Sequence, residues 1–362
     1  FISFDDGDNW QSLHLNLPPV PITDLTIRQG DLVVATQGRG FYVMDNISIF
    51  SQIADDQAEK ELHVLNPSPT MMVTGRRDGS NIEGKNPPNG VILSYHIKDD
   101  QEGPLSIDIL DSLGTLVRHY SSEESARDRC VIGNMSPRQK RKLTYPAKKQ
   151  GMNLWTWDMR REGLICIDDV FMFSGWNGAK VMPGDYQARI SIGNVQETVP
   201  FSLLPDPRDS AVKSEYDVVE SKIVESTQLF NEIITSLDNT RTARRQIKGL
   251  MADNLNNADL QMNATQAVEQ IGEWEKKITQ VYFQVLEDED AWPSMLEVQV
   301  KHVVDVIDRA GAPIANGALQ RLEDLKSEWA GLKSDLETIK TNHIEPINQW
   351  AENNNVRHVV SP

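Results

Sequence analysis

The chain has 362 residues, with 53 acidic and 36 basic side chains and a formal net charge of −17 at pH 7. A surface of this sign repels nucleic-acid phosphates and anionic lipid headgroups, so the composition argues against both as partners. The length allows two or three domains. No apolar run is long enough for a membrane span.

The first 46 residues alternate short apolar runs with turn residues, which predicts strands at 2–4, 11–15, 22–28, 31–36 and 41–44. The pattern Ser3-x-Asp5-x-Gly7-x-x-Trp10 fits the turn between the first two of these strands. Ser and Asp side chains accept backbone N–H groups, Gly adopts a positive φ, and Trp covers the turn. We interpret these four residues as structural and not as a metal or sugar site.

Residues 47–86 read as a connector, with a short amphipathic piece, a strand at 63–65 and irregular sequence after it. Residues 87–204 then alternate apolar and polar positions in about seven short runs. This spacing predicts an immunoglobulin or fibronectin-type antiparallel β-sandwich. Trp155 and Trp157 share one face of its strand at 153–158. We favour core packing for both, with stacking on a sugar ring as the alternative.

An insert at 121–150 carries the basic cluster Arg138, Lys140, Arg141 and Lys142. A solvated loop is the favoured interpretation, and a docking loop for an acidic partner is the alternative. The two cysteines, Cys130 and Cys166, fall in this domain. The sequence leaves open whether they form one bridge or stay as free buried thiols.

Residues 205–345 repeat apolar side chains at spacings of three and four, which predicts four amphipathic helices. We expect a self-contained antiparallel helical bundle, with an oligomerisation seam as the alternative. The acidic run Glu287 to Asp290 is interpreted as a solvated loop between helices. Residues 346–362 are expected to be a C-terminal tail.

Catalytic patterns are not found in the sequence. The histidines are scattered, and no metal-ligand spacing, nucleophile elbow or phosphate-binding loop is present. We therefore predict no catalytic residue, no metal site and no cofactor in this segment.

Several short motifs occur in a characteristic order. The turn motif at Ser3 to Trp10 is an Asp-box, and ATQGRGF follows at 35–41. Then come NPPNG at 86–90, LDSLG at 110–114, WDMR at 157–160, PGDY at 183–186 and LPDPR at 204–208. Together they resemble the C-terminal part of bacterial BNR-repeat, sortilin-type β-propeller proteins, which are often labelled glycosyl hydrolases. The sandwich also resembles the Ig-like domain of flagellar hook-capping proteins.

The resemblance implies a multidomain β plus α architecture. Residues 1–46 would be the last propeller blade, 87–204 the Ig-like sandwich and 205–345 the helical bundle. The partners implied are upstream blades of the same protein and a peptide or glycan ligand, and the protein would be exported. The function expected is non-catalytic protein or glycan binding and scaffolding. The alternatives are accessory domains of a BNR-repeat glycoside hydrolase and an assembly subunit that uses its bundle.

Overall fold

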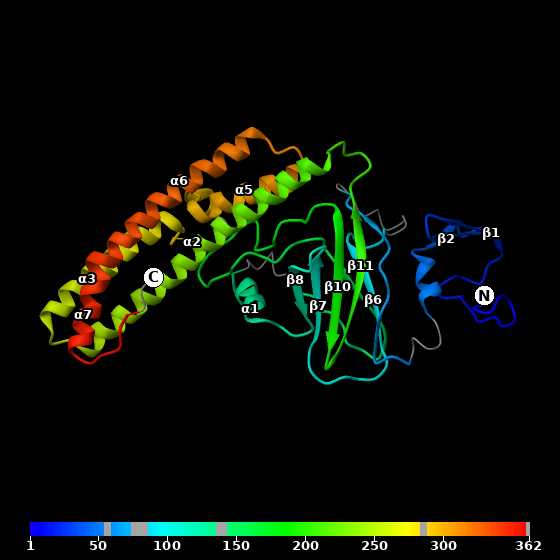
Figure 1. The fold of residues 1–362 in the computed structure, drawn as a ribbon, viewed down its shortest axis with the longest axis horizontal. Coiled ribbons are helices and arrows are strands. Elements are labelled where there is room, and N and C mark those ends of the chain that lie inside the picture. The colour runs from blue at the N-terminus through cyan, green and yellow to red at the C-terminus, as the bar shows by residue number, and fades with distance from the viewer. Residues whose placement is uncertain (54–58, 74–85, 135–142, 283–287, 360–362) are drawn as a thin grey trace.

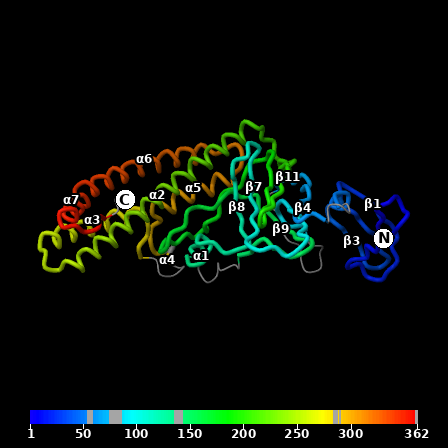
Figure 2. The backbone as a smooth tube through the Cα atoms, turned by 60° about the horizontal axis from the view of Figure 1, so that its bottom comes forward, coloured from blue at the N-terminus to red at the C-terminus, as the bar shows by residue number. Residues whose placement is uncertain are grey.

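The computed structural model describes residues 1–53, 59–73, 86–134, 143–282 and 288–359. It is a mixed β and α protein, as the sequence predicts, with several sheets followed by packed helices. Figure 1 shows a small sheet at the N-terminal end, larger sheets in the middle and the helices at the other end. The turned view in Figure 2 keeps this order.

The small N-terminal sheet is antiparallel, in the order β1-β2-β3. Its three strands confirm the predicted runs at 22–28, 31–36 and 41–44. The strands predicted at 2–4 and 11–15 are wrong, because this part holds only an isolated bridge between Ile2 and Gln11. The strands are β1 (Ile22–Arg28), β2 (Asp31–Thr36) and β3 (Phe41–Met44).

Two further sheets form the middle of the molecule. One has the order β4-β6-β9, and the other has the order β5-β11-β10-β7-β8. The first contains β4 (Leu62–Val64), β6 (Val91–Ile97) and β9 (Gly151–Trp157). The second contains β5 (Thr70–Met71), β7 (Leu105–Asp111), β8 (Leu116–Ser121), β10 (Gly184–Ile192) and β11 (Val195–Leu204).

The connector expected over 47–86 contributes to both of these sheets. It begins with a 3-10 turn, η1 (Ile47–Gln52), and then supplies the edge strands β4 and β5. Strand β4 pairs antiparallel with β6, and β5 pairs parallel with β11. The two-sheet unit therefore begins some 25 residues earlier than the sequence pattern suggested.

Both middle sheets bury one face against a shared apolar core. In β10 every second side chain from Tyr186 to Ile192 is buried, which is the period of two that a half-buried strand requires. Residues from both sheets meet in this core, among them Tyr95 and Trp157 from one sheet and Ile107 and Phe201 from the other.

The helices follow from residue 213 onward and pack mainly side by side. Helix α2 packs on α3 and α5, and α6 packs on α5 and α3. The elements are α2 (Lys213–Asp253), α3 (Ala258–Ile278), α4 (Asp288–Ala291), α5 (Leu296–Ala310), α6 (Asn316–Ile339), the π-helical turn η2 (Lys340–Ile344) and α7 (Glu345–Asn353).

The C-terminal tail expected over 346–362 is largely structured. Helix α7 continues the chain beyond η2 and buries Ile347 and Ala351, and Val359 beyond it is also buried. The acidic run at 287–290 falls partly outside the described residues, and its described part begins α4. Helix α3 ends at Ile278, before this acidic run.

The segment between β9 and β10 joins the sheets to the helices. It carries apolar side chains that belong to the helical core and not to the sheet core, including Leu164, Val170 and Trp176. The Trp176 ring lies edge-on to Phe230 of α2, with centroids 6.2 Å apart. This shared core fixes the position of the helices relative to the sheets.

The predicted loop insert contains a short helix and a disulfide. Helix α1 (Ala126–Gly133) begins at Ser125, whose side chain accepts from the backbone N–H of Asp128 in a capping box. Cys130 in this helix is bridged to Cys166, which settles the alternative left open by the sequence. The basic cluster at 138–142 lies outside the described residues.

Candidate functional site

The Asp-box residues form a turn that satisfies its own polar groups. The Ser3 hydroxyl donates to Asp5 Oδ1 and accepts from the Gly7 backbone N–H, both at 2.8 Å. Asp5 accepts from the Asn9 backbone N–H at 2.8 Å, and the Trp10 indole donates to the Gly7 carbonyl at 2.9 Å. The bonds from Asn9 and then Ser3 lower the pKa of Asp5. Its carboxylate is committed to the turn.

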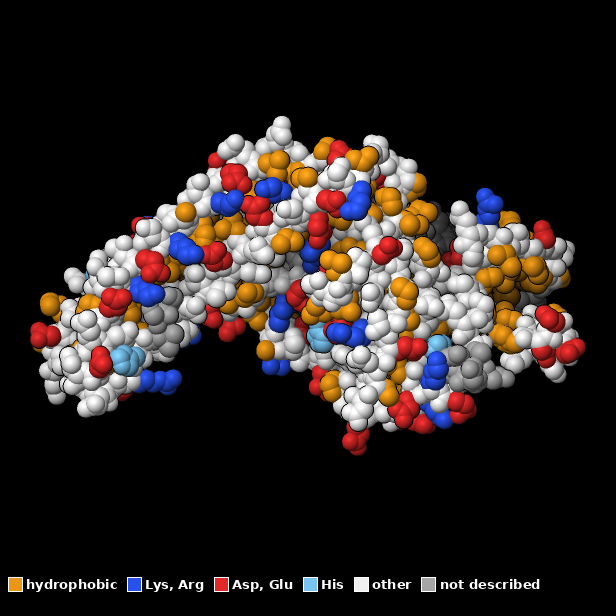
Figure 3. All heavy atoms as spheres, in the orientation of Figure 1, with side chains coloured by type: hydrophobic (Ala, Val, Ile, Leu, Met, Phe, Trp, Pro, Cys, Tyr) orange, Lys and Arg blue, Asp and Glu red, His pale blue; other side chains and the backbone are white. Residues whose placement is uncertain are grey.

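Both faces of the β1–β3 sheet expose apolar side chains, although the face of Phe41 and Val43 also carries Asp24, Thr26 and Arg28 of β1. Leu25 and Ile27 lie on the face that Val34 shares, whereas Phe41 and Val43 lie on the opposite face. Their exposed fractions are 62% for Leu25 and Ile27, 77% for Phe41 and 56% for Val43. Figure 3 shows hydrophobic side chains gathered over this end of the molecule. We therefore treat this exposed apolar patch as the first candidate site.

The two tryptophans considered as sugar-stacking residues, Trp155 and Trp157, differ in burial. Trp157 is completely buried, donates to the Arg160 carbonyl at 2.9 Å and packs edge-on to Phe201. A sugar ring has no access to the Trp157 ring, so Trp157 is a core residue and not a binding residue. Trp155 is half-buried and meets the Tyr120 ring at 5.3 Å in an edge-to-face pair.

Trp155→Ala is expected to lower the free energy of unfolding by about 2 kcal/mol, because a half-buried aromatic contact is lost. Glycan binding on an oligosaccharide array should stay the same. The matched control is Trp292→Ala, at a position 41% exposed, which should cost less than about 1 kcal/mol. Loss of glycan binding at unchanged stability would show that Trp155 is a stacking residue.

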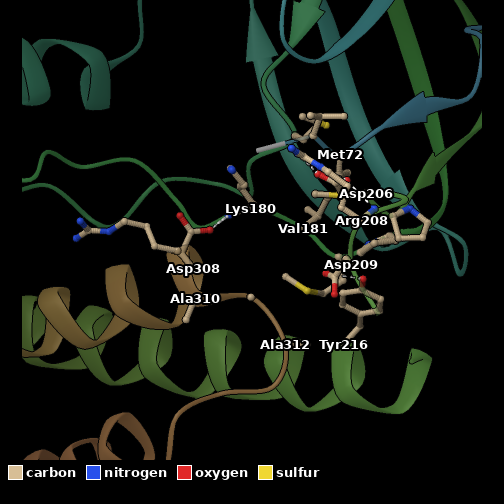
Figure 4. A pocket seen from close by; sticks show the side chains of 17 residues that line it. Met72, Lys180, Val181, Asp206, Arg208, Asp209, Tyr216, Asp308, Ala310 and Ala312 are labelled. Atoms are coloured by element: carbon tan, nitrogen blue, oxygen red, sulfur yellow. Dashed lines mark hydrogen bonds and ion pairs between the residues drawn. The ribbon is translucent and has the colours of Figure 1, made fainter. Parts of the chain in front are cut away.

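A cavity of about 660 Å³ lies where the sheets, the helices and the segment that joins them meet. Figure 4 shows side chains from these parts around it: Met72 after β5, Lys180 and Val181 before β10, Tyr216 of α2 and Asp308 of α5. Binding sites concentrate at such domain junctions, and this volume is typical of small-molecule sites. We therefore treat it as a second candidate site, the junction cavity.

Most acidic groups of the junction cavity are held by neighbours. Asp206 pairs with Arg208, and Asp209 accepts from the Tyr216 hydroxyl at 2.9 Å. Burial, followed by this bond and the nearby carboxylates, raises the pKa of Tyr216 to about 12. The phenol therefore stays protonated and donating at neutral pH.

Asp308 joins the sheets to α5 at the wall of the cavity. Its side chain is 6% exposed, and it pairs with Arg160 at 3.1 Å while accepting from the Lys180 backbone N–H at 2.7 Å. In Figure 4 the Lys180 ammonium points away from the Asp308 carboxylate. Among the described residues, no carboxylate forms an ion pair with this ammonium.

A second group of contacts holds the helices to the segment between β9 and β10. Arg161 pairs with Glu220 of α2, and Asn231 of α2 accepts from the Ile165 backbone N–H at 3.0 Å. Arg241 of α2 donates to the carbonyls of Asp168 and Asp169. These contacts, together with Arg160 and Asp308, make the junction a fixed surface.

The comparisons with known proteins gave no match, either to a family model or to a curated protein. In the described ranges no group of three or more His, Cys, Asp and Glu side chains is placed to hold a metal ion. The helices of the described part all fall short of the length and apolar character that crossing a bilayer requires.

Sequence reasoning missed the junction cavity. Its walls come from positions as far apart as Met72, Lys180 and Asp308, and none of them belongs to a recognisable motif. Three of the short motifs supply wall residues: WDMR at 157–160 supplies Met159, PGDY at 183–186 supplies Pro183, and LPDPR at 204–208 supplies Asp206 and Arg208. None of these motifs predicts a cavity, because the cavity forms only where α5 packs beside them.

Proposed function

We propose that this chain is a non-catalytic binding and scaffolding region of a β-propeller protein. In this proposal the β1–β3 sheet is a terminal blade that docks against neighbouring blades. The two middle sheets form an Ig-like sandwich, and the helices form an antiparallel bundle that extends from it. Its partners are further β-sheets of the same protein and a peptide or glycan ligand bound by the assembled propeller.

The observation that carries the proposal is the exposure of apolar side chains on both faces of one small sheet. Apolar side chains exposed on both faces are buried only when a partner layer covers each face, even though the face of Phe41 and Val43 is polar along β1. Radially stacked blades provide this arrangement. Burying a large aliphatic or aromatic side chain is worth about 1.5–3 kcal/mol, so Leu25, Ile27, Phe41 and Val43 together supply a substantial docking energy.

The scaffolding role is supported by the fixed junction between sheets and helices. Helix α2 has 41 residues and therefore extends about 60 Å at 1.5 Å per residue. It is tied to the sheets along its N-terminal half by Arg161 and by the shared core around Trp176. A rigid arm of this kind holds a bound partner at a set distance from the blade.

Export is supported by the bridge between Cys130 and Cys166. Disulfides persist mainly in oxidising compartments such as the periplasm and the extracellular space. The net charge of −17 fits a partner that is not a nucleic acid.

The docking proposal is tested with one substitution on each face of the small sheet, Ile27→Asp and Val43→Asp. The neighbouring blades that the proposal requires would be produced as a separate polypeptide and mixed with this chain. Complex formation is measured by size-exclusion chromatography with light scattering. Each substitution is expected to weaken the complex at least about tenfold, because a carboxylate is forced into an apolar contact.

The matched control is Leu113→Asp, which changes an exposed apolar residue in a turn of the middle sheets, at 89% exposure. It should leave the complex intact. A complex that forms equally well with all three variants, or no complex with the unmodified chain, would rule out the docking role of the β1–β3 sheet.

A further inference from the structure

We propose that the junction cavity binds a monocarboxylate that carries an apolar group, with Lys180 as the anion-binding residue. This inference concerns a site separate from the β1–β3 sheet, and it does not depend on the proposed function. The ligand class follows from the charges, the walls and the volume of the cavity.

Lys180 supplies the reason for an anion. Its backbone is fixed, because its N–H donates to Asp308 and it lies in an isolated bridge with Arg160. Its ammonium is turned away from Asp308 in Figure 4, and no carboxylate of the described chain pairs with it. A half-buried ammonium without a carboxylate partner is stabilised by an anion that enters the cavity.

The surrounding charges restrict that anion to a single negative charge. Lys180, Arg208 and Arg309 line the cavity together with Asp206, Asp209 and Asp308, so the formal charges of the lining sum to zero. Arg208 is already paired with Asp206 at 2.5 Å. Arg160 likewise pairs with Asp308 at 3.1 Å. Among the described residues, the lining cations without a carboxylate partner are Lys180 and Arg309, and they face Asp209 alone, so one further negative charge balances the site. A carboxylate supplies this single negative charge, whereas a phosphate dianion would bring a second one close to Asp209.

The remaining walls determine the other end of the ligand. Apolar side chains face the cavity from the segment after β5, from the segment before β10 and from the segment after β11. They are Met72, Val73, Val181, Met182, Pro183 and Pro205. Methionine side chains adapt to ligands of varied shape. At about 660 Å³ the cavity has room for a hydrophobic dipeptide end or a medium-length fatty acid.

The test uses methionine-methyl NMR on the whole chain, because Met72 and Met182 line the cavity whereas Met262 is exposed on α3. The probes are N-acetyl-leucyl-leucine, its C-terminal amide, decanoate and inorganic phosphate. We expect saturable shifts of the Met72 and Met182 methyl signals with at least one of the two carboxylates. The acid that binds identifies the source of the ligand, a peptide end or a fatty acid.

The amide should bind at least about tenfold more weakly than the peptide acid, which corresponds to roughly 1.4 kcal/mol. Lys180→Met should remove this difference, and Lys248→Met, an exposed lysine on α2, should preserve it. Ala310→Trp, which adds bulk at the cavity wall, should weaken every probe that binds. The proposal is overturned if the peptide acid binds and its amide binds equally well, or if Lys180→Met leaves the affinity for the binding acid unchanged. It is also overturned by a response to phosphate alone, by shifts at Met262 equal to those at Met72, or by no response to either carboxylate.

Discussion

Replacing Glu275 with alanine is expected to lower the free energy of unfolding by about 3–5 kcal/mol, because it leaves two arginines without their buried partner. The Glu275 side chain is 4% exposed and lies between two residues of α2. It accepts from Arg241 Nε at 2.7 Å and pairs through its other oxygen with Arg244. Removing the carboxylate also frees the guanidinium that holds the carbonyls of Asp168 and Asp169.

The matched control lies two residues away. Glu273 is 66% exposed and, among the described residues, pairs with Lys276 alone, so Glu273→Ala should change the unfolding free energy by less than about 0.5 kcal/mol. Urea unfolding followed by circular dichroism of the helices measures both variants. If Glu275→Ala and Glu273→Ala unfold at the same urea concentration, the buried charge cluster does not hold α2 to α3.

Glu297→Gln is expected to stabilise the protein at pH 8 by about 3 kcal/mol while changing little at pH 4. Glu297 is 1% exposed near the start of α5, and among the described atoms its Oε2 has no hydrogen-bond partner. Burial raises the pKa of this carboxyl from 4.5 to about 7, although hydrogen bonds from Thr279 and nearby backbone N–H groups act in the opposite direction.

The direction of this pH dependence follows from whether the folded or the unfolded chain holds the Glu297 proton. Below pH 4.5 the carboxyl is protonated in both the folded and the unfolded chain, so it does not oppose folding. Between pH 4.5 and about 7 the folded chain keeps the proton that the unfolded chain has released, and the free energy of unfolding falls as the pH rises. Above pH 7 the folded state carries the full cost of a buried charge. Glutamine does not titrate, so the variant lacks this loss.

The measurement is the urea midpoint of both proteins at pH 4, 6 and 8. The difference between them should grow with pH and level off above about pH 8. Glu328→Gln, at an exposed position on α6, should follow the unmodified protein within about 0.5 kcal/mol at each pH. A constant difference between Glu297→Gln and the unmodified protein would contradict a titrating buried carboxyl.

Local patterns were sufficient where a short segment fixes its own structure. The runs that became β1, β2 and β3 were predicted at their observed bounds. The stripe at spacings of three and four along 216–237 predicted the buried face of α2. In each case neighbouring residues carry the information.

The sequence was insufficient where contacts join distant segments. It placed strands at 2–4 and 11–15, where the structure holds a single bridge. It predicted the strand at 63–65 that corresponds to β4 but assigned it to a connector, because its pairing with β6 depends on a distant segment. It missed β5, because a strand of two residues carries too little periodicity to detect. It assigned Trp155 and Trp157 to the same face of one strand. It could not show that the Trp157 ring is fully buried whereas the Trp155 ring, two residues earlier, is only half-buried.

By itself the sequence determined the mixed β and α composition, the acidic surface and the turn chemistry around Asp5, because these depend on residue types and their spacing. The tertiary structure alone decided the pairing of Cys130 with Cys166, the burial of Glu275 and Glu297, and the cavity around Lys180. Each of these depends on packing between segments tens of residues apart. The residues near a given position in the sequence do not determine which side chain of a distant segment packs against it.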